Sequence, residues 1–170
     1  DQARALRSDA VDIVKVVADA TASAQVSGPN HPITLIAPNT EVFMLGDEVR
    51  IHQVVANLLT NARTHTPNGT PIAVMITSND QEVSISVADQ GPGMSEEDQK
   101  RIFERFYRTD PARSRETGGT GLGLSIVKHV ITSHLGEVKL SSKPGIGSTF
   151  TLRLPLADKK LVAKKKVTNG

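Results

Sequence analysis

The sequence contains no cysteine and few aromatic residues. Of its 170 residues, none is Cys or Trp, one is Tyr and four are Phe. The absence of Cys excludes a disulfide scaffold, a catalytic thiol and thiolate metal sites. A hydrophobic content of 38% still provides for a core, which must be mainly aliphatic. No apolar run approaches the roughly 20 residues that a membrane span needs, and no signal-peptide pattern opens the chain, so we expect a soluble domain.

Positive charge is concentrated at one end of the sequence. The 20 Lys and Arg residues against 18 Asp and Glu residues give a formal net charge of +2. Residues 158–170 hold five Lys and one Asp, which leaves 15 basic and 17 acidic residues in 1–157. A nucleic-acid-binding domain usually carries its positive charge on the folded body. We therefore expect no nucleic-acid partner, and we interpret the tail as a solvated terminus instead of a membrane or nucleic-acid contact.

The hydrophobic pattern predicts helices and strands in an order that is typical of a two-layer fold. Apolar residues at spacings of three and four predict helices over 1–25, 47–64, 95–105 and 122–135. Alternating apolar residues predict strand pairs over 33–37 and 41–45, 72–77 and 82–88, and 137–142 and 148–154. The first pair is expected to form a hairpin around Pro38-Asn39. The predicted fold class is α/β (α+β), a two-layer sandwich with helices on one face of a mixed, mostly antiparallel sheet.

Three amide side chains lie on one face of the helix predicted over 47–64. Gln53, Asn57 and Asn61 are each four residues apart, so their side chains stack along that face. A solvated face usually favours Glu, Lys and Arg, and Asn is a poor helix former. Contact with a ligand is the functional interpretation, and a solvated polar face is the alternative that this helix alone leaves open.

Glycine clusters follow at three later points in the chain. Gly91 and Gly93 come directly after a predicted strand that ends at Asp89, whose carboxylate could face a ligand. A second cluster, residues 118–124, leads straight into a helix, where backbone N–H groups and the helix dipole favour a phosphate. This cluster has neither the Lys of a P-loop nor the preceding strand of a dinucleotide fingerprint. A third pair stands at 145 and 147, and each cluster alone is compatible with an ordinary turn.

Taken in order, these motifs resemble those of the ATP-binding domain of bacterial sensor histidine kinases, which has a Bergerat-type ATP-binding fold. The resemblance is carried by Asn57-Leu58-Leu59-Thr60-Asn61-Ala62, Asp89-Gln90-Gly91-Pro92-Gly93, residues 102–108, Gly119-Thr120-Gly121-Leu122-Gly123 and Gly145-Ile146-Gly147-Ser148-Thr149-Phe150. They are similar to the family's N box, F box and three glycine boxes in order and spacing, over about residues 10–156.

The resemblance implies that the domain binds ATP and Mg²⁺, and it assigns roles to individual residues. Asp89 would accept a hydrogen bond from the exocyclic amine of adenine. Asn61, helped by Asn57, would bind the Mg²⁺ that bridges the phosphates, and Arg108 would lie near the terminal phosphate. Residues 109–118 would form a mobile lid, with Phe103 and Phe106 at its base or, for Phe103, in the core. The other expected nucleotide contacts are His65, Gly91, Gly93, Gly119, Thr120, Gly121, Leu122, Gly123 and Thr149.

The match departs from the family pattern directly after the N box. Many members carry Lys-Tyr where this sequence has Thr64-His65. We expect His65 to stack on adenine as the Tyr does, with a solvated helix end as the alternative. The phosphate contact of the Lys is lost, and Arg63, Arg113 or Arg115 are candidates to replace it.

The phosphoacceptor is expected to lie outside this domain. In the family it is a His on a helical dimerisation domain, and none of the five His residues here has that setting. We divide the chain into a remnant of that domain (1–9), the ATP-binding domain (10–156) and a basic tail (157–170). The resemblance implies transfer of the γ-phosphoryl group of ATP to that His in cis or trans, with a response regulator as an indirect partner. It also implies a cytoplasmic location in a membrane-anchored sensor, and we expect the fragment itself to be monomeric.

Two other functions stay open from the sequence. The related ATPases, such as the gyrase B subunit, MutL and the heat-shock chaperones, use a Glu one turn before the metal-binding Asn to activate water. That position here is Asn57, which cannot act as a general base, so we expect slow hydrolysis. The second alternative is a non-catalytic nucleotide-binding scaffold, and the intact motifs favour the kinase over it.

Overall fold

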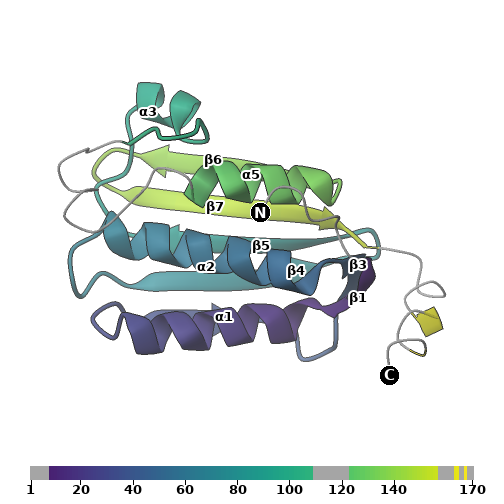
Figure 1. Cartoon of the computed structure of the whole chain (residues 1–170). Coiled ribbons are helices and arrows are strands. Elements are labelled where there is room, and N and C mark those ends of the chain that lie inside the picture. Colours follow the sequence, from purple (N-terminus) through teal and green to yellow (C-terminus); the bar gives the residue numbers. More distant parts are fainter. Residues whose placement is uncertain (1–7, 109–122, 157–162, 165–166, 168–170) are drawn as a thin grey trace.

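The structure, a computed structural model, describes residues 8–108, 123–156, 163–164 and 167. Helices α1, α2 and α5 lie side by side over one face of a sheet, and α3 lies beyond the sheet's upper left end in the view of Figure 1. The elements are β1 (Asp9–Asp12), α1 (Ile13–Ser27), β2 (Ile33–Ile36), β3 (Phe43–Gly46), α2 (Glu48–Thr64), β4 (Ile72–Ser78), β5 (Glu82–Asp89), α3 (Glu96–Arg101), α5 (Gly123–Ser133), β6 (Glu137–Lys143) and β7 (Gly147–Pro155).

The main sheet has five strands in the order β2-β4-β5-β7-β6. Strand β2 pairs with β4 in parallel, whereas the neighbours β4 and β5, β5 and β7, and β7 and β6 pair antiparallel. Strands β1 and β3 form a separate two-stranded antiparallel sheet. A mixed, mostly antiparallel sheet with helices on one face confirms the predicted fold class.

The core lies between the helices and the sheet, and it is aliphatic as the composition predicts. On β5, Val83, Ile85 and Val87 are buried and alternate with half-buried residues. Leu58 and Leu59 of α2 are at most 1% exposed. Each such side chain contributes about 1.5–3 kcal/mol to the stability of the folded state when it is fully buried. This core fixes α2 over the sheet and thereby decides which face of α2 remains accessible.

Local sequence signals place the ends of the later helices. Asp47 caps α2, because its side chain accepts a hydrogen bond from the backbone N–H of Arg50 at 3.3 Å. Ser95 caps α3 in the same way, because its hydroxyl oxygen accepts from the backbone N–H of Asp98 at 3.1 Å. Helix α3 ends at Arg101, four residues before the predicted end, and the chain then continues through turns in which Phe106 has a φ of 64°. None of the described helices combines the length and the apolar character that crossing a membrane requires.

The predicted first helix is correct only from Ile13 onwards. Residues 9–12 form β1, which pairs with β3, a segment more than 30 residues away along the chain. Val11 fits a helical spacing with the residues that follow, so periodicity alone could not separate the strand from the helix. Asp12 marks the boundary, because its side chain accepts a hydrogen bond from the backbone N–H of Lys15 at 3.2 Å and caps α1. Residues 1–7 lie outside the described part of the chain.

The predicted hairpin at Pro38-Asn39 is wrong. Both strands exist, but β2 pairs with β4 in the main sheet and β3 pairs with β1 in the small sheet. The two segments around Pro38 therefore diverge into different sheets. The four other predicted strands are confirmed as β4 to β7, in which neighbours in sequence pair through the β4–β5 and β6–β7 registers.

Candidate functional site

The accessible face of α2 carries three of the predicted site residues. Asn57, Asn61 and His65 are half-buried and lie one turn apart toward the end of the helix. The Nδ2 of Asn57 donates a hydrogen bond to the carbonyl oxygen of Gly123 at 3.2 Å, which joins α2 to the first residue of α5. The backbone N–H of His65 donates to the backbone carbonyl oxygen of Asn61 at 3.1 Å, which is the last hydrogen bond of the helix. This row of side chains therefore runs from the start of α5 to the end of α2.

Asp89 ends β5 on the helix-covered face of the sheet. Its Oδ1 accepts a hydrogen bond from the backbone N–H of Gly91 at 2.9 Å, and the carboxylate also accepts one from the backbone N–H of Ser148. Burial raises the pKa of Asp89 above its ordinary value of 3.8, while these two hydrogen bonds and the nearby His65 act in the opposite direction. The result is a half-desolvated acceptor held in one position.

Two glycines allow the loop after β5 to pack closely against its surroundings. A Cβ atom on Gly91 would lie 2.5 Å from Cγ2 of Thr66 and 3.1 Å from Oδ1 of Asp89. Gly93 has a φ of 71°, and a Cβ atom there would overlap the carbonyl group of Lys143. The loop thus passes between the end of α2 and the β6–β7 turn. This packing brings Thr66, Asp89 and Gly91 together. We call these three residues the base end, after the adenine base that Asp89 is expected to bind.

Strand β7 places Ser148, and not Thr149, on the face that carries Asp89. Ser148 lies opposite Asp89 in the β5–β7 register, and Thr149 lies opposite Ala88. Side chains alternate between the two faces of a strand, and Ser148 is 5% exposed on the same face as the buried Phe150. Thr149, the expected contact, therefore lies on the opposite face of the sheet from Asp89, and Ser148 is the hydroxyl on the Asp89 face. The alternation with Phe150 was the available signal, but its meaning depends on the register with β5.

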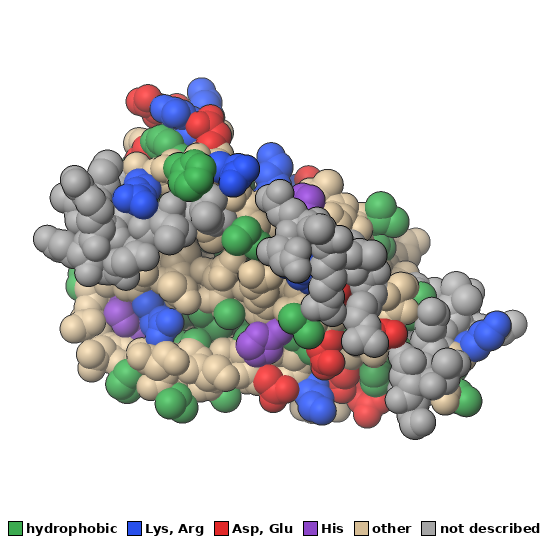
Figure 2. Space-filling view, viewed as in Figure 1, with side chains coloured by type: hydrophobic (Ala, Val, Ile, Leu, Met, Phe, Trp, Pro, Cys, Tyr) green, Lys and Arg blue, Asp and Glu red, His purple; other side chains and the backbone are tan. Residues whose placement is uncertain are grey.

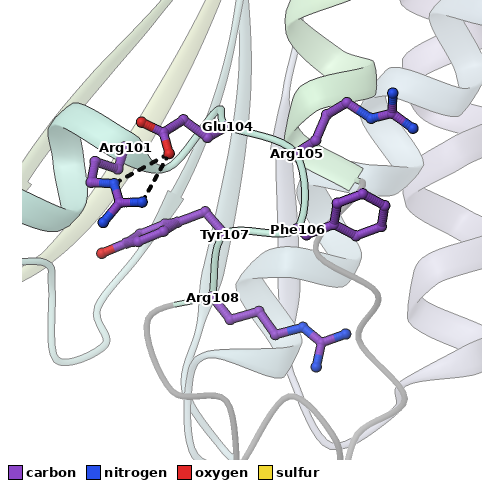
Figure 3. A pocket seen from close by; sticks show the side chains of 6 residues that line it. All are labelled: Arg101, Glu104, Arg105, Phe106, Tyr107 and Arg108. Atoms are coloured by element: carbon purple, nitrogen blue, oxygen red, sulfur yellow. Dashed lines mark hydrogen bonds and ion pairs between the residues drawn. The ribbon is translucent and has the colours of Figure 1, made fainter.

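Residues 101–108 comprise the last residue of α3 and the turns that follow it, and their polar contacts are made among themselves and with α3. Arg101 forms an ion pair with Glu104 at 3.1 Å and lies 4.6 Å from the ring centre of Tyr107, whose hydroxyl donates to Asp98. Figure 3 shows Tyr107 and Arg101 on one side of this turn, and Phe106 and Arg105 on the other. A pocket of about 380 Å³ is lined by Arg101, Glu104, Arg105, Phe106, Tyr107 and Arg108. Arg108, the predicted γ-phosphate contact, therefore lies in this pocket.

The two phenylalanines of this segment differ in environment. Phe103 is half-buried and contacts Phe150 edge-to-face, with ring centres 6.0 Å apart, so it belongs to the core. Phe106 is 62% exposed. Basic and acidic side chains are intermingled around α3 in the upper left of Figure 2, so this surface does not carry one sign of charge. The lid over 109–118, whose base both residues were expected to anchor, lies outside the described residues.

Arg63, one of the three candidates to replace the missing Lys, contacts the end of α1 in this structure. Its Nη1 donates to the carbonyl oxygen of Ala24 at 3.1 Å, and its side chain packs over Gly28, so it braces α2 against the end of α1. The other candidates for that role, Arg113 and Arg115, fall outside the described residues. The same holds for five residues of the second glycine cluster, namely Gly118, Gly119, Thr120, Gly121 and Leu122.

The donor set at α2 fits Mg²⁺ better than a metal that needs a protein cage. Within residues 8–108 and 123–156, no group of three or more His, Asp or Glu side chains could hold a metal ion. Asn61 offers one amide oxygen at a half-buried position. Mg²⁺ keeps several water ligands and needs few protein ligands when phosphates supply the others.

Comparison with known proteins agrees with this geometry. A family model described as "Histidine kinase-, DNA gyrase B-, and HSP90-like ATPase" matches residues 46–158. Sensor-like histidine kinase SenX3 of Mycolicibacterium smegmatis is 46% identical over 149 residues, which cover 86% of this chain and 38% of SenX3. This chain therefore spans well under half the length of that relative.

Two solved structures show the same fold. The catalytic domain of histidine kinase ThkA, in a nucleotide-free form, matches with a TM-score of 0.77 and 25% identity, over 88% of this chain and 95% of that one. Full-length ShkA in complex with AMPPNP matches with a TM-score of 0.73 and 29% identity, over 90% of this chain and 31% of that one. The chain belongs to the histidine kinase-, DNA gyrase B- and HSP90-like ATPase family, and its fold is that of a histidine kinase catalytic domain.

Proposed function

We propose that this chain binds Mg²⁺·ATP between α2, the end of β5 and the start of α5, and presents the γ-phosphate to a histidine of another domain. The observation that carries the proposal is the half-buried Asp89, fixed by two backbone N–H groups beside the polar face of α2. The family match and the AMPPNP complex of ShkA support ATP as the ligand.

The base end is suited to adenine. The exocyclic amine of adenine donates to the carboxylate of Asp89, while guanine would place a carbonyl oxygen against this acceptor and be rejected. His65 lies near Asp89 and is positioned to contact the ring. Ser148 replaces Thr149 as the hydroxyl at this end, because it faces the same side of the sheet as Asp89.

The phosphates would extend from the base end along α2 toward α5. Asn61 is the residue that would hold Mg²⁺, and Asn57 lies one turn further along, tied to Gly123. When bound, Mg²⁺ neutralises charge on the phosphate oxygens. Arg108 provides a guanidinium for the terminal phosphate, where charge spreads during transfer. The N–H groups of Gly119 to Gly123 remain the proposed cover of the phosphates.

The reaction that fits this arrangement is phosphoryl transfer with little hydrolysis. An imidazole nitrogen on a separate dimerisation domain, in cis or in trans, forms the bond to the γ-phosphorus, and the bond to the β,γ-bridging oxygen breaks to release ADP. Asn57 stands where related hydrolases carry a Glu, and an amide cannot deprotonate water. Catalysis then rests on positioning and charge neutralisation. We place the domain on the cytoplasmic side of a sensor, with a response regulator as the final acceptor.

Calorimetric titration with a non-hydrolysable ATP analogue, with and without Mg²⁺, tests this proposal. We expect Mg²⁺-dependent binding that Asn61→Ala removes. Gln53→Ala is the matched control, because Gln53 is on the same helix face but two turns away, and its binding should equal that of the wild type. The kinase proposal fails if the folded wild-type chain shows no binding at millimolar nucleotide, and the scaffold alternative would then be preferred.

A further inference from the structure

We propose that His31, a buried residue of the α1–β2 turn (residues 28–32), is a positioning residue that holds the base end in place and thereby supports the choice of adenine. This inference rests on the proposed function. His31 is 5% exposed and Thr66 is 3% exposed, so both side chains are removed from solvent. Neither belongs to the motifs that the sequence comparison with the kinase family brought out.

The hydrogen bonds around Thr66 determine which atom of His31 carries the proton. The hydroxyl of Thr66 donates its one hydrogen to the carbonyl oxygen of Ala62 at 2.8 Å. Toward His31 the same oxygen therefore acts as the acceptor, and Nε2 of His31, at 2.9 Å, is the donor. A weaker contact from the same Nε2 reaches the carbonyl oxygen of Thr66 at 3.3 Å. The imidazole thus holds both the side chain and the backbone of Thr66.

The turn that carries His31 is itself firmly anchored. Gln25 donates to the carbonyl oxygen of His31 at 2.9 Å and accepts from the backbone N–H of Ile33 at 2.8 Å. The carbonyl oxygen of Asn30 accepts from the backbone N–H of Gly69 at 2.7 Å. The turn is therefore fixed both to α1 and to the loop that follows α2, and it can act as a rigid support.

The contact continues from Thr66 to the proposed adenine acceptor. The Cγ2 of Thr66 packs so closely on Gly91 that a Cβ atom there would lie 2.5 Å away. The backbone N–H of Gly91 in turn holds Oδ1 of Asp89 at 2.9 Å. Hence the position of the Asp89 carboxylate depends on Thr66, and that of Thr66 depends on His31. A buried hydrogen-bond acceptor discriminates between bases only while it is held in one position.

The test measures the affinities of Mg²⁺-bound, non-hydrolysable ATP and GTP analogues for variants of this chain. His31→Leu removes the donor, and we expect ATP-analogue binding about three- to tenfold weaker, the equivalent of one hydrogen bond. GTP-analogue binding should change less, so the ATP-to-GTP selectivity falls. His31→Gln retains an N–H near the position of Nε2 and should restore most of this selectivity. Thr66→Val removes the same bond, together with the hydroxyl's bond to Ala62, in a side chain of nearly the same shape, and should reproduce the loss.

His134→Leu is the matched control for burial. His134 is 8% exposed and its ring bridges α5 and the start of α2, with Nδ1 2.8 Å from the carbonyl oxygen of Val130 and Nε2 accepting from the backbone N–H of Asp47 at 3.0 Å. This variant should lower the thermal unfolding midpoint and leave the selectivity unchanged. A His31→Leu or Thr66→Val chain that is less stable but equally selective would overturn the positioning role. A folded wild type that binds no ATP analogue would overturn the proposed function itself, and the inference with it.

Discussion

The two ends of the proposed nucleotide site are built in different ways. The base end is formed by buried or half-buried residues from the loop after α2, the end of β5 and the loop after β5. Each contacts a distant segment: Thr66 accepts from His31, Gly91 packs on Thr66, and Asp89 accepts from the backbone N–H of Ser148. In residues 101–108, by contrast, the ion pair, the cation–π contacts of Arg101 and Arg105 and the Tyr107 hydrogen bond link residues of the same segment or of the adjoining α3. The ring of Phe103 is the exception, because it contacts Phe150 of β7 and Lys128 of α5. Only Ile102, Phe103 and Tyr107 of this segment pack on the core.

This difference assigns different tasks to the two ends. An acceptor that selects a base must be rigid, because a mobile carboxylate could also accommodate the wrong base. The side that delivers a phosphate must open toward an incoming partner, and an exposed turn around Arg108 meets that need. Substitutions at the base end should therefore alter nucleotide affinity, whereas substitutions of exposed residues before Arg108 in this segment, such as Phe106, should leave it nearly unchanged.

The largest expected effect comes from Gly91→Ala. The added methyl group would contact Thr66 at 2.5 Å and Asp89 at 3.1 Å, so the base end must rearrange. Overpacking of this kind costs about 1–3 kcal/mol, and we expect a comparable loss in ATP-analogue binding, measured by calorimetry. Retention of wild-type affinity would show that the base end is not rigid.

Asp89→Asn should weaken ATP-analogue binding by about 1–3 kcal/mol, because an amide mispairs with the adenine amine. The same change should stabilise the free protein at neutral pH. Burial raises the pKa of Asp89 in the folded protein. The free energy of unfolding therefore decreases as the pH rises through that pKa, and the uncharged Asn side chain avoids this decrease. Thermal unfolding between pH 4 and pH 7 measures this, and an unchanged dissociation constant for the nucleotide would argue against the adenine assignment.

Ser148→Ala and Thr149→Ala should show which face of β7 contributes to nucleotide binding. Loss of the Ser148 hydroxyl, which lies 2.8 Å from Oγ of Ser142, should weaken nucleotide binding by about 1 kcal/mol. Thr149→Ala, on the open face of the sheet, should bind as the wild type does. The opposite ranking in parallel titrations would restore Thr149 as the nucleotide contact.

The smallest expected effect comes from Phe106→Gly. Phe106 is 62% exposed and has a φ of 64°, a conformation that glycine adopts without strain. The free energy of unfolding should change by no more than about 0.5 kcal/mol, or increase slightly, in urea denaturation. A loss well above this value would mean that residues 101–108 are held as firmly as the base end.

The sequence was sufficient for features that depend on neighbours along the chain. The cap at Asp47, the β4–β5 pair and the β6–β7 pair follow from local patterns, and the motif order pointed to the family. Features that depend on distant partners were not predictable in the same way. The β1–β3 pairing, the parallel position of β2 and the contact of Arg63 with Ala24 join segments that periodicity treats separately. The choice between Ser148 and Thr149 likewise required the register with β5.

The most direct test of the account is a nuclear magnetic resonance titration of the chain with Mg²⁺ and AMPPNP, and in parallel with adenosine alone. We expect both ligands to shift the backbone amide signals of Thr66, Gly91 and Ser148, because the base end is already formed. Only AMPPNP with Mg²⁺, and not adenosine, should shift the signals of Asn61 and Gly123. Shifts confined to the open face of the sheet, or no shift at the base end with either ligand, would contradict the account.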